Sequence, residues 1–508
     1  MASLIPRTKA AGMLLNKTRM LGQQNARHFS ACAAKHQAAV VSSQTSSKQA
    51  ADSWTNVNTG SEFTVSSQSG FLPRRDPLPV LPGYFEKLEE ILHEMPIYKG
   101  DGTYGLLHSG RFGERVEREL PMYDVDFVFD NRILGALYRD YTFLASAYLL
   151  EPCDIQFRLA RNYGLARRIL PANIAKPLQT IAARLNAQPF LEHSMGFTFY
   201  NYRRKDVSAP ASIDNIEPIR RFSGCDAENS YIVGHVAAAQ HTGAMVEASL
   251  ELLGSCQSNN RAVFDQALQK YTAAMDKVNG ILSRTLMNNG EYASFRTYLS
   301  GCKSQPMFST GVIYEGTEDV PFSSASAARQ FLGVAQSSNP IASLNTHLFQ
   351  LSNLSPQGTL PCSDGIDRLR PENYRAFFAH IADNARNGSI QSYALQSPVS
   401  SAHYTAVLDQ VLAYRYRQWA NLRDSIHLQT LRSSSEFRTY LDVQTRHIRD
   451  IAELILRTRS NTDLEVLTST QRAATDNIAH RAEIVRRSLS RILEDGEPSQ
   501  LPTSMIAY

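Results

Sequence analysis

The sequence has few of the features that point directly to a function. Its six cysteines show no CxxC or Cys/His spacing, which argues against a zinc site and a disulfide framework and is typical of a reducing compartment. No apolar run approaches the roughly 20 residues that a membrane span needs. The GxGxxG, P-loop, HExxH and GxSxG motifs are absent. A net charge of +4 is too small to indicate a nucleic-acid partner.

The first 51 residues lack acidic side chains. They contain seven Lys/Arg and no Asp or Glu, and they are rich in Ala, Ser and Gln. The stretch "ARHFSA", in which Arg27 lies shortly before Phe29, resembles a matrix-processing site. We therefore expect residues 1–51 to be a mitochondrial transit peptide, with a plain disordered tail as the alternative and a cytoplasmic location to match it. Residues 52–79 are polar and unpatterned, which predicts a linker.

Helical periodicity dominates the remainder of the chain. "YFEKLEEILHEM" (84–95) places Phe85, Leu88 and Ile91 at helical intervals, and "VDFVFDNRILGALYRDYTFLASAYLL" (125–150) is apolar on more than one face, as in a buried helix. Strand patterns are few. The sequence thus predicts an all-α fold with strands at 196–202 and 311–316 and with further helices at about 171–186, 229–254, 259–289, 372–385, 403–430, 434–460 and 465–494.

Several motifs between these helices occur in one order. They are "RRILPANIAKP" (167–177), "FYNYRRKD" (199–206), "FSGCDAENSYIVGHVAAA" (222–239), "FRTYLSGCKSQPMFSTGVIYEG" (295–316), "FSSASAARQ" (322–330) and "RPENYRAFF" (370–378). In this order and spacing they resemble the indoleamine 2,3-dioxygenase family from about Gly70 to about Asp450. The most specific part is the R-x-Y-L-S-G-x-K block followed by G-x-x-Y-E-G.

The resemblance implies an organisation and an activity. It implies a smaller N-terminal helical domain (80–210) that caps a large helical domain of the haem-binding type (211–460), followed here by a C-terminal helical extension (461–508). It also implies haem b, and the O2-dependent opening of the indole ring of L-tryptophan, or of a related small-molecule indole, to N-formylkynurenine. We expect such a protein to be a monomer without nucleic acid or a membrane span.

Two substrate-binding positions follow from the family pattern. The arginine of the R-x-Y-L-S-G block, which meets the substrate carboxylate in the family, is Arg296; its planar charged fork suits a carboxylate, and a surface arginine is the alternative. The Ser-Ala pair of the distal loop corresponds to Ser326 and Ala327. Glycines flank this pair in the family, whereas Ser and Ala flank it here, so we expect a stiffer loop.

The distal pocket departs further from the family. An aromatic residue of that pocket corresponds to Phe222, for which a core role is equally consistent with the sequence. Where the family has two adjacent phenylalanines over the haem, this chain has Glu291 and Tyr292. A carboxylate in an apolar pocket costs several kcal/mol unless it is paired or protonated. Glu291 therefore predicts a wetter pocket, an ion pair with a substrate cation, or an outward-facing side chain.

Two residues compete for the position of the proximal iron ligand. Ungapped register with the family's L-R-x-x-H pattern places Gln418 there, whereas "LRDSIHLQT" places His427 there with one extra residue. On a regular helix the nine residues between them correspond to about 180°, and Gln418 falls within the apolar stripe. His427 can turn toward that stripe only if a bulge absorbs the extra residue. The sequence leaves both assignments open.

Other histidines carry weaker patterns. His235 and His241 are six residues apart, lack the i, i+4 spacing of a shared metal site and fall on different faces of one helix. His193 lies near a family pocket residue and is either polar lining or structural. Two functional classes remain: a haem dioxygenase, favoured by Arg296 and Ser326-Ala327, and a diverged protein that has lost haem and acts as a binding or structural protein, favoured by Gln418 and Glu291.

Overall fold

The computed structural model describes Trp54 and residues 61–285, 294–299, 306–308, 312–317, 339–354, 367, 370–427 and 435–495, without the side chains of 422, 424–427, 435–440 and 495. The segment expected to direct import, 1–51, lies outside these residues. Residues 54–508 form one compact unit. The predicted domain borders at 210 and 460 both fall inside this unit and stay predictions.

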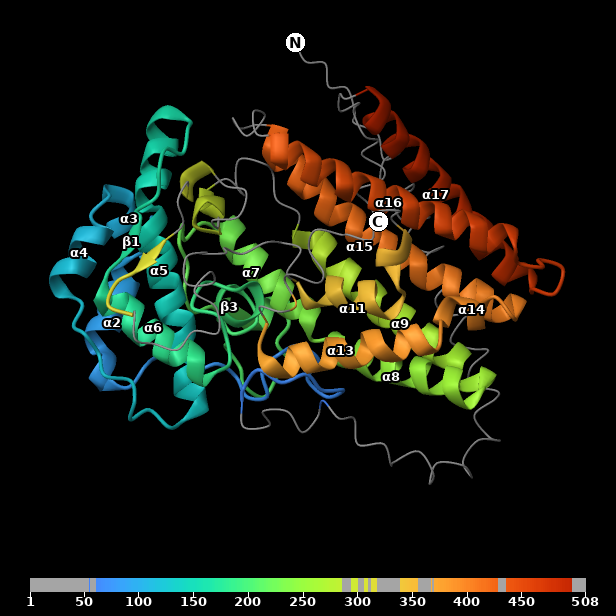
Figure 1. The fold of residues 1–508 in the computed structure, drawn as a ribbon, viewed down its shortest axis with the longest axis horizontal. Coiled ribbons are helices and arrows are strands. Elements are labelled where there is room, and N and C mark those ends of the chain that lie inside the picture. The colour runs from blue at the N-terminus through green and yellow to red at the C-terminus, as the bar shows by residue number, and fades with distance from the viewer. Residues whose placement is uncertain are drawn as a thin grey trace, which may run out of the picture. The chain divides into compact units, whose positions relative to one another are not determined.

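Helices dominate the described residues, which confirms the all-α fold class. The α-helices are α2 (Glu86–Glu94), α3 (Leu106–Ser109), α4 (Phe112–Glu119), α5 (Asn131–Ala160), α6 (Ala172–Arg184), α7 (Asp226–Ala239), α8 (Thr242–Ser258), α9 (Arg261–Leu282), α11 (Pro340–Leu348), α13 (Glu372–Asn387), α14 (Ile390–Ala394), α15 (Pro398–His427), α16 (Ser435–Ser460) and α17 (Ser469–Asp495). In Figure 1, α2–α6 gather on one side of α7, and α8, α9 and α13–α17 gather on the other.

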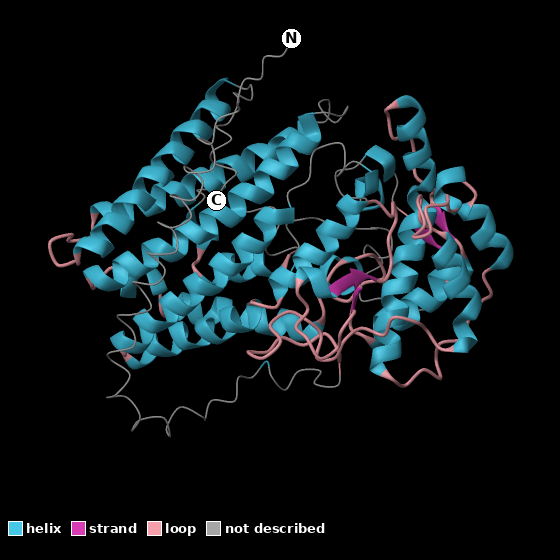
Figure 2. Cartoon of the chain, turned by 180° about the vertical axis from the view of Figure 1, so that it is seen from behind, coloured by secondary structure: helices cyan, strands magenta, loops and turns pink. Residues whose placement is uncertain are grey.

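Strands are short and few among the described residues. β1 (Ile169–Leu170) pairs in parallel with β4 (Ile313–Tyr314), and β2 (Tyr202–Arg204) pairs antiparallel with β3 (Ile216–Pro218). Figure 2 shows how little of the chain they occupy. The strand expected at 311–316 is present as β4, but the one expected at 196–202 is wrong. The π-helical turn η4 (His193–Phe197) ends inside that segment, a turn follows it, and β2 begins only at Tyr202. Glu192 starts η4 by accepting the backbone N–H groups of Ser194 and Met195.

α5 carries a buried ionic network. Asp140 accepts from Arg139 Nε at 2.7 Å and from both Nε (2.9 Å) and Nη2 (2.8 Å) of Arg220, while Arg220 also pairs with Glu89 on α2 at 2.7 Å. Neither Arg139 nor Asp140 is exposed to solvent. Burial opposes the ionisation of Asp140, but the two guanidinium groups outweigh it and hold the pKa of that carboxyl below its usual value. The network ties α2, α5 and the chain entering α7 together.

A second buried carboxylate starts α7. Glu228 accepts the backbone N–H groups of Phe222, Ser223 and Gly224 at 2.7 to 2.9 Å, so it satisfies the donors of the turn that leads into the helix. Gly224 has a φ of +72°, and a Cβ there would lie 1.9 Å from the carbonyl oxygen of Tyr98. Only glycine fits this turn. The turn therefore fixes where α7 begins and which of its faces meets its neighbours.

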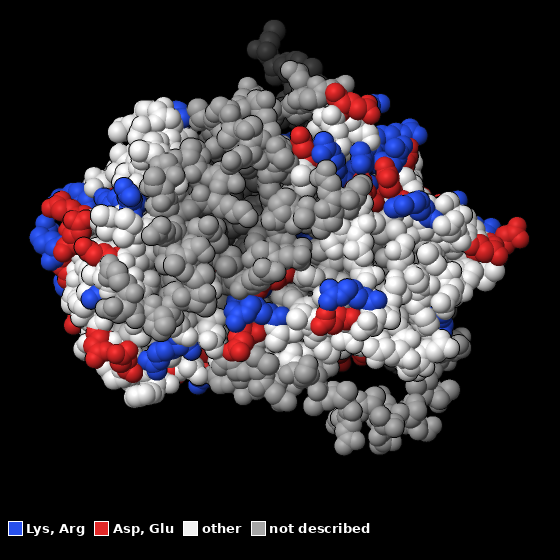
Figure 3. Space-filling model, in the orientation of Figure 1, with Lys and Arg blue, Asp and Glu red and all other residues white. Residues whose placement is uncertain are grey.

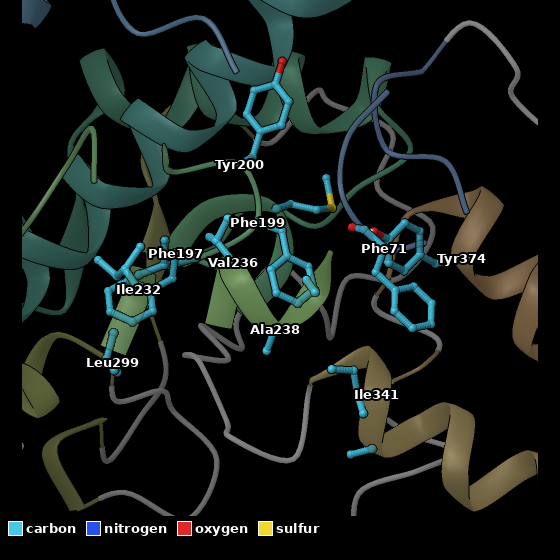
Figure 4. Packing of buried hydrophobic residues seen from close by; sticks show 14 of the residues in the cluster. Phe71, Phe197, Phe199, Tyr200, Ile232, Val236, Ala238, Leu299, Ile341 and Tyr374 are labelled. Carbon is cyan, nitrogen blue, oxygen red and sulfur yellow. The ribbon is translucent and has the colours of Figure 1, made fainter. Parts of the chain in front are cut away.

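The segment expected to be a linker packs into the core where it is described. Phe63, Val65 and Phe71 are buried. The backbone N–H of Phe71 donates to Thr242 Oγ1 at 3.0 Å, and the Tyr374 hydroxyl donates to the carbonyl oxygen of Phe71 at 2.6 Å. Figure 4 shows Phe71 beside Tyr374 in the cluster that surrounds α7. Residues 61–72 thus belong to the folded core, because their aromatic side chains pack against residues that are far away in sequence.

The C-terminal extension forms a helical hairpin with α16. α17 buries Ile478, Ala482, Val485 and Leu489, and Arg481 pairs with Asp409 of α15 at 2.5 Å. On the face shown in Figure 3, basic side chains alternate with acidic ones over this hairpin. A search of the described helices finds none long and apolar enough to cross a membrane.

We expect Asp140→Asn to destabilise the fold by about 3–5 kcal/mol, because it leaves buried guanidinium charge without its counter-charge. Urea unfolding at pH 7 measures the change. Asp126→Asn, at an exposed position, is the matched control and should stay within about 0.5 kcal/mol of the parent. Equal stability of the two variants would show that the network is not essential.

Candidate functional site

A cavity of about 40 Å³ lies among α7, α9 and α15. Its walls are Tyr231 and His235 from α7, Leu282 and Thr285 from α9 and the turn after it, and Tyr414, Arg417, Gln418 and Asn421 from α15. The four α15 residues recur at i, i+3, i+4 and i+7, so they share one helix face. The cavity therefore lies where the inner faces of α7 and α15 meet.

His235 presents an imidazole to this cavity. Its Nδ1 lies 2.8 Å from the carbonyl oxygen of Tyr231, which can only accept, so Nδ1 carries the proton and Nε2 keeps its lone pair. Among the described residues Nε2 has no hydrogen-bond partner. Burial lowers the pKa of His235 to about 4, although the Tyr231 carbonyl opposes this. The ring is neutral near pH 7, which is the state that binds a metal.

A second imidazole lies behind the first. The rings of His193 and His235 are 5.3 Å apart at 72°, an edge-to-face contact. His193 is fully buried, and its Nε2 has no hydrogen-bond partner in the described structure. Burial, and then the charges of His235 and Arg370, hold the pKa of His193 well below its ordinary value. The sequence had left His193 between pocket lining and structure; it stands one layer behind the cavity wall.

Gln418 lies on the inner face of α15, as its position in the apolar stripe predicts. The helix is continuous from Pro398 to His427, without a π-helical turn. The bulge that the His427 assignment requires is therefore absent from α15, and position 427 falls about 180° around the axis from 418. The His427 side chain lies outside the described residues, so its role as ligand stays a prediction that this helix does not favour.

Two arginines of α15 near the site make different contacts. Arg417 lines the cavity, and its Nη1 donates to Asn279 Oδ1 at 2.9 Å. Burial lowers the pKa of Arg417 to about 10, which still leaves it charged at neutral pH. Arg415, in contrast, donates to the carbonyl oxygen of Ala342 at 2.8 Å and to the Thr346 hydroxyl. Arg417 is thus the cation of the cavity wall, and Arg415 ties α15 to α11.

Arg296 belongs to a short segment that touches the cavity wall. Its neighbour Phe295 is fully buried and packs on Tyr231, with ring centroids 5.7 Å apart. The Nη1 of Arg296 is buried and has no hydrogen-bond partner among the described residues. A buried guanidinium nitrogen without a partner is costly, which is the situation that a ligand carboxylate relieves.

Of the other predicted substrate-binding residues, the structure describes Phe222, which is not at the cavity wall. Phe222 is fully buried between Phe143 and Tyr298, with ring centroids 4.5 and 4.9 Å away, so it serves the core. Glu291, Tyr292, Ser326 and Ala327 lie outside the described residues. Their roles stay predictions.

A larger cleft of about 380 Å³ lies apart from this site, between the chain before residue 355, α14 and α16. Amide side chains and Arg457 line it, and none of the predicted site residues contributes to it. We therefore take the α7–α15 cavity as the candidate site.

The comparisons with known proteins point the same way. The family model described as indoleamine 2,3-dioxygenase matches residues 59–417, which ends one residue before Gln418. Human indoleamine 2,3-dioxygenase 2 is 24% identical over 288 residues, covering 54% of this chain and 66% of the relative. Rat indoleamine 2,3-dioxygenase 1 is 23% identical (53% and 62%), and Penicillium citrinum indoleamine 2,3-dioxygenase qulI is 24% identical (48% and 52%). The chain spans less than two thirds of each relative.

The cavity can be tested for haem b, the cofactor that the family implies. Haem iron takes an axial His, Cys, Met or Tyr. His235 offers such a donor, Arg417 offers a cation for a propionate, and the amide of Gln418 is not a usual axial donor. The cavity volume of about 40 Å³ admits roughly one water molecule. His235 is a donor that haem iron accepts, but the cavity as it stands does not fit a porphyrin.

We expect the unfolding free energy of the protein without added haem to fall as the pH drops below 6.5. His193 stays neutral when folded but binds a proton when unfolded, so its contribution is complete above pH 6.5 and is lost toward lower pH. Well below pH 6.5 the loss approaches at most about 1.4 kcal/mol per pH unit for one histidine. His193→Phe should remove that part of the pH dependence, as measured by urea unfolding. Substitution of the exposed His480 is the control and should leave the pH dependence unchanged. An unchanged slope in His193→Phe would contradict the assignment.

Proposed function

Because the chain belongs to the indoleamine 2,3-dioxygenase family, we propose that it is a haem-dependent dioxygenase. Its proposed substrate is L-tryptophan or a related indole amino acid, whose indole ring it opens to the N-formylkynurenine type of product with both atoms of O2. Haem b, when bound, supplies the oxygen chemistry. The protein's own residues supply the iron donor, bind the substrate and exclude bulk water.

One observation carries the substrate proposal. Arg296 occupies the R-x-Y-L-S-G position and has a buried guanidinium nitrogen without a partner among the described residues. The carboxylate of an amino acid supplies the missing acceptor in a charge-assisted hydrogen bond. The contact between Phe295 and Tyr231 joins this arginine's segment to the cavity wall. An indole held by its carboxylate at Arg296 would thus lie near the proposed cofactor site.

A second candidate is a protein of the same fold that binds an indole or another small molecule without haem. The amide of Gln418 on the inner face of α15 and the small cavity favour this candidate. The two candidates differ in one measurement. The full chain purified after expression with added haem precursor has a Soret band only if the first candidate is correct.

We further propose that residues 1–51 direct the protein to mitochondria, on the strength of their basic, acid-free composition. A fluorescent fusion of residues 1–51 should enter mitochondria, and the same fusion with Arg7→Glu, Arg19→Glu and Arg27→Glu should not. A diffuse cytosolic signal from the unaltered fusion would refute this proposal. It would leave the proposed activity untouched.

For Arg296→Ala we expect KM for tryptophan to rise about 10- to 150-fold, the equivalent of the 1.5–3 kcal/mol that a charge-assisted hydrogen bond contributes. KM for tryptamine, which lacks the carboxylate, should change little. Steady-state kinetics on both substrates measure the difference. Arg296→Lys should recover part of the loss, and Arg284→Ala, at an exposed arginine nearby in sequence, should have no effect. Equal changes for both substrates would show that Arg296 does not bind the carboxylate.

A further inference from the structure

An exposed aromatic face lies where the turn η3 (Gly83–Phe85) meets the loop between α4 and α5. The face consists of Tyr84, Met122, Phe127 and Phe129, whose side chains are 51%, 50%, 50% and 83% exposed. The rings of Tyr84 and Phe127 meet edge to face with centroids 5.1 Å apart, so two separate segments share the face. A group of large apolar side chains in water is typical of a surface that binds a partner.

The loop that carries most of this face is held in place from beneath. Val125 and Val128 are buried and alternate with exposed residues. Arg184, the last residue of α6, donates to the carbonyl oxygen of Val125 at 2.9 Å and to that of Val128. It also donates to the carbonyl oxygen of Asp126 at 3.3 Å, and its Cζ lies 5.8 Å from the centre of the Phe129 ring. The loop is thus ordered before a partner arrives, which lowers the entropic cost of binding.

Exposed carboxylates accompany the aromatic face. Glu86 follows Tyr84 in sequence, and Asp124 and Asp126 come between the apolar residues of the loop. None of the three forms an ion pair with a residue that the structure describes, and Lys87, next to Glu86, pairs with Glu90 at 2.5 Å. This surface is therefore acidic, although the whole chain has a net charge of +4.

We propose that the aromatic face and its three carboxylates form a docking surface for a basic amphipathic helix of a partner protein. Such a helix carries an apolar stripe with Lys and Arg beside it, so both kinds of its side chains find a complement here. An added strand fits less well, because the carbonyl groups of Val125, Asp126 and Val128 already accept from Arg184. The proposal goes beyond the proposed activity and does not depend on haem.

The charge of the surface argues against two other occupants. A second copy of the same face would bring carboxylates against carboxylates, and like charges that face one another across an interface cost affinity. An anionic membrane surface attracts basic segments and repels acidic ones. A basic helix is the occupant whose charge complements Glu86, Asp124 and Asp126.

The test measures the binding of a defined probe to the full-length protein by fluorescence anisotropy. The probe is a fluorescein-labelled synthetic helix of Leu and Lys with its Leu residues along one stripe. The double variant Phe127→Ser/Phe129→Ser should weaken binding about tenfold or more. The triple variant Glu86→Gln/Asp124→Asn/Asp126→Asn should weaken binding at low salt and remove most of its salt dependence.

Two controls separate this surface from unspecific association. Leu159→Ser changes a leucine on α5 that is 83% exposed, as Phe129 is, and this variant should bind the probe like the parent protein. A helix of Leu and Glu with the same Leu stripe should not bind, because its charge has the same sign as that of the surface. Circular dichroism checks that each variant folds. If the double variant does not fold, the triple variant, which changes exposed side chains only, decides the question.

Four results overturn the proposal. The first is a parent protein that does not bind the Leu/Lys helix, and the second is equal binding by the parent protein and the Phe127→Ser/Phe129→Ser variant. The third is parent binding to vesicles of phosphatidylglycerol and phosphatidylcholine that this double variant abolishes, which identifies a membrane surface instead. The fourth is a dimer in analytical ultracentrifugation that the double variant dissociates, which identifies a second copy of the chain. None of these results bears on the proposed dioxygenase activity.

Discussion

The fold depends on a carboxylate that has no access to water. Asp140 lies in the middle of α5 with one guanidinium beside it on the same helix and another from Arg220. The ionic network is stable only while each of its charges is paired, because removal of one partner leaves a charge that the interior cannot solvate. Arg220 is followed within two residues by the turn whose N–H groups Glu228 collects. The ion pair of Arg220 is thus adjacent in sequence to the turn that leads into α7, the helix that carries His235.

The electrostatics of the site follow from what surrounds it. Among the described residues that line the cavity, Arg417 is the one with a charged side chain, and none has a carboxylate. The nearby histidines are buried and neutral at physiological pH. Such a site favours neutral nitrogen donors and anionic groups, and it penalises an unpaired cation. The carboxylate of the proposed amino-acid substrate matches this environment.

The two helices that face one another give the site its polarity. α15 turns Tyr414, Arg417 and Gln418 toward α7, and α7 turns Tyr231 and His235 toward α15. One face offers an imidazole and the other offers amide and guanidinium donors. The family model matches residues 59–417 and therefore covers α7 but only part of α15.

The sequence by itself determined the helical class, because a 3.6-residue apolar period is a local property that survives any tertiary context. The same local rule placed Gln418 on the inner face of α15 and left position 427 on the outer one. Motifs in order identified the family and Arg296. Tertiary structure alone decided the rest. His235 and His241, which the sequence placed on one helix, lie on α7 and at the start of α8, and the neighbours of His235 in space, His193 and Gln418, come from distant segments. The sequence predicted a linker at residues 61–72 for the same reason, because the partners of Phe71 lie on α8 and α13, far away in sequence.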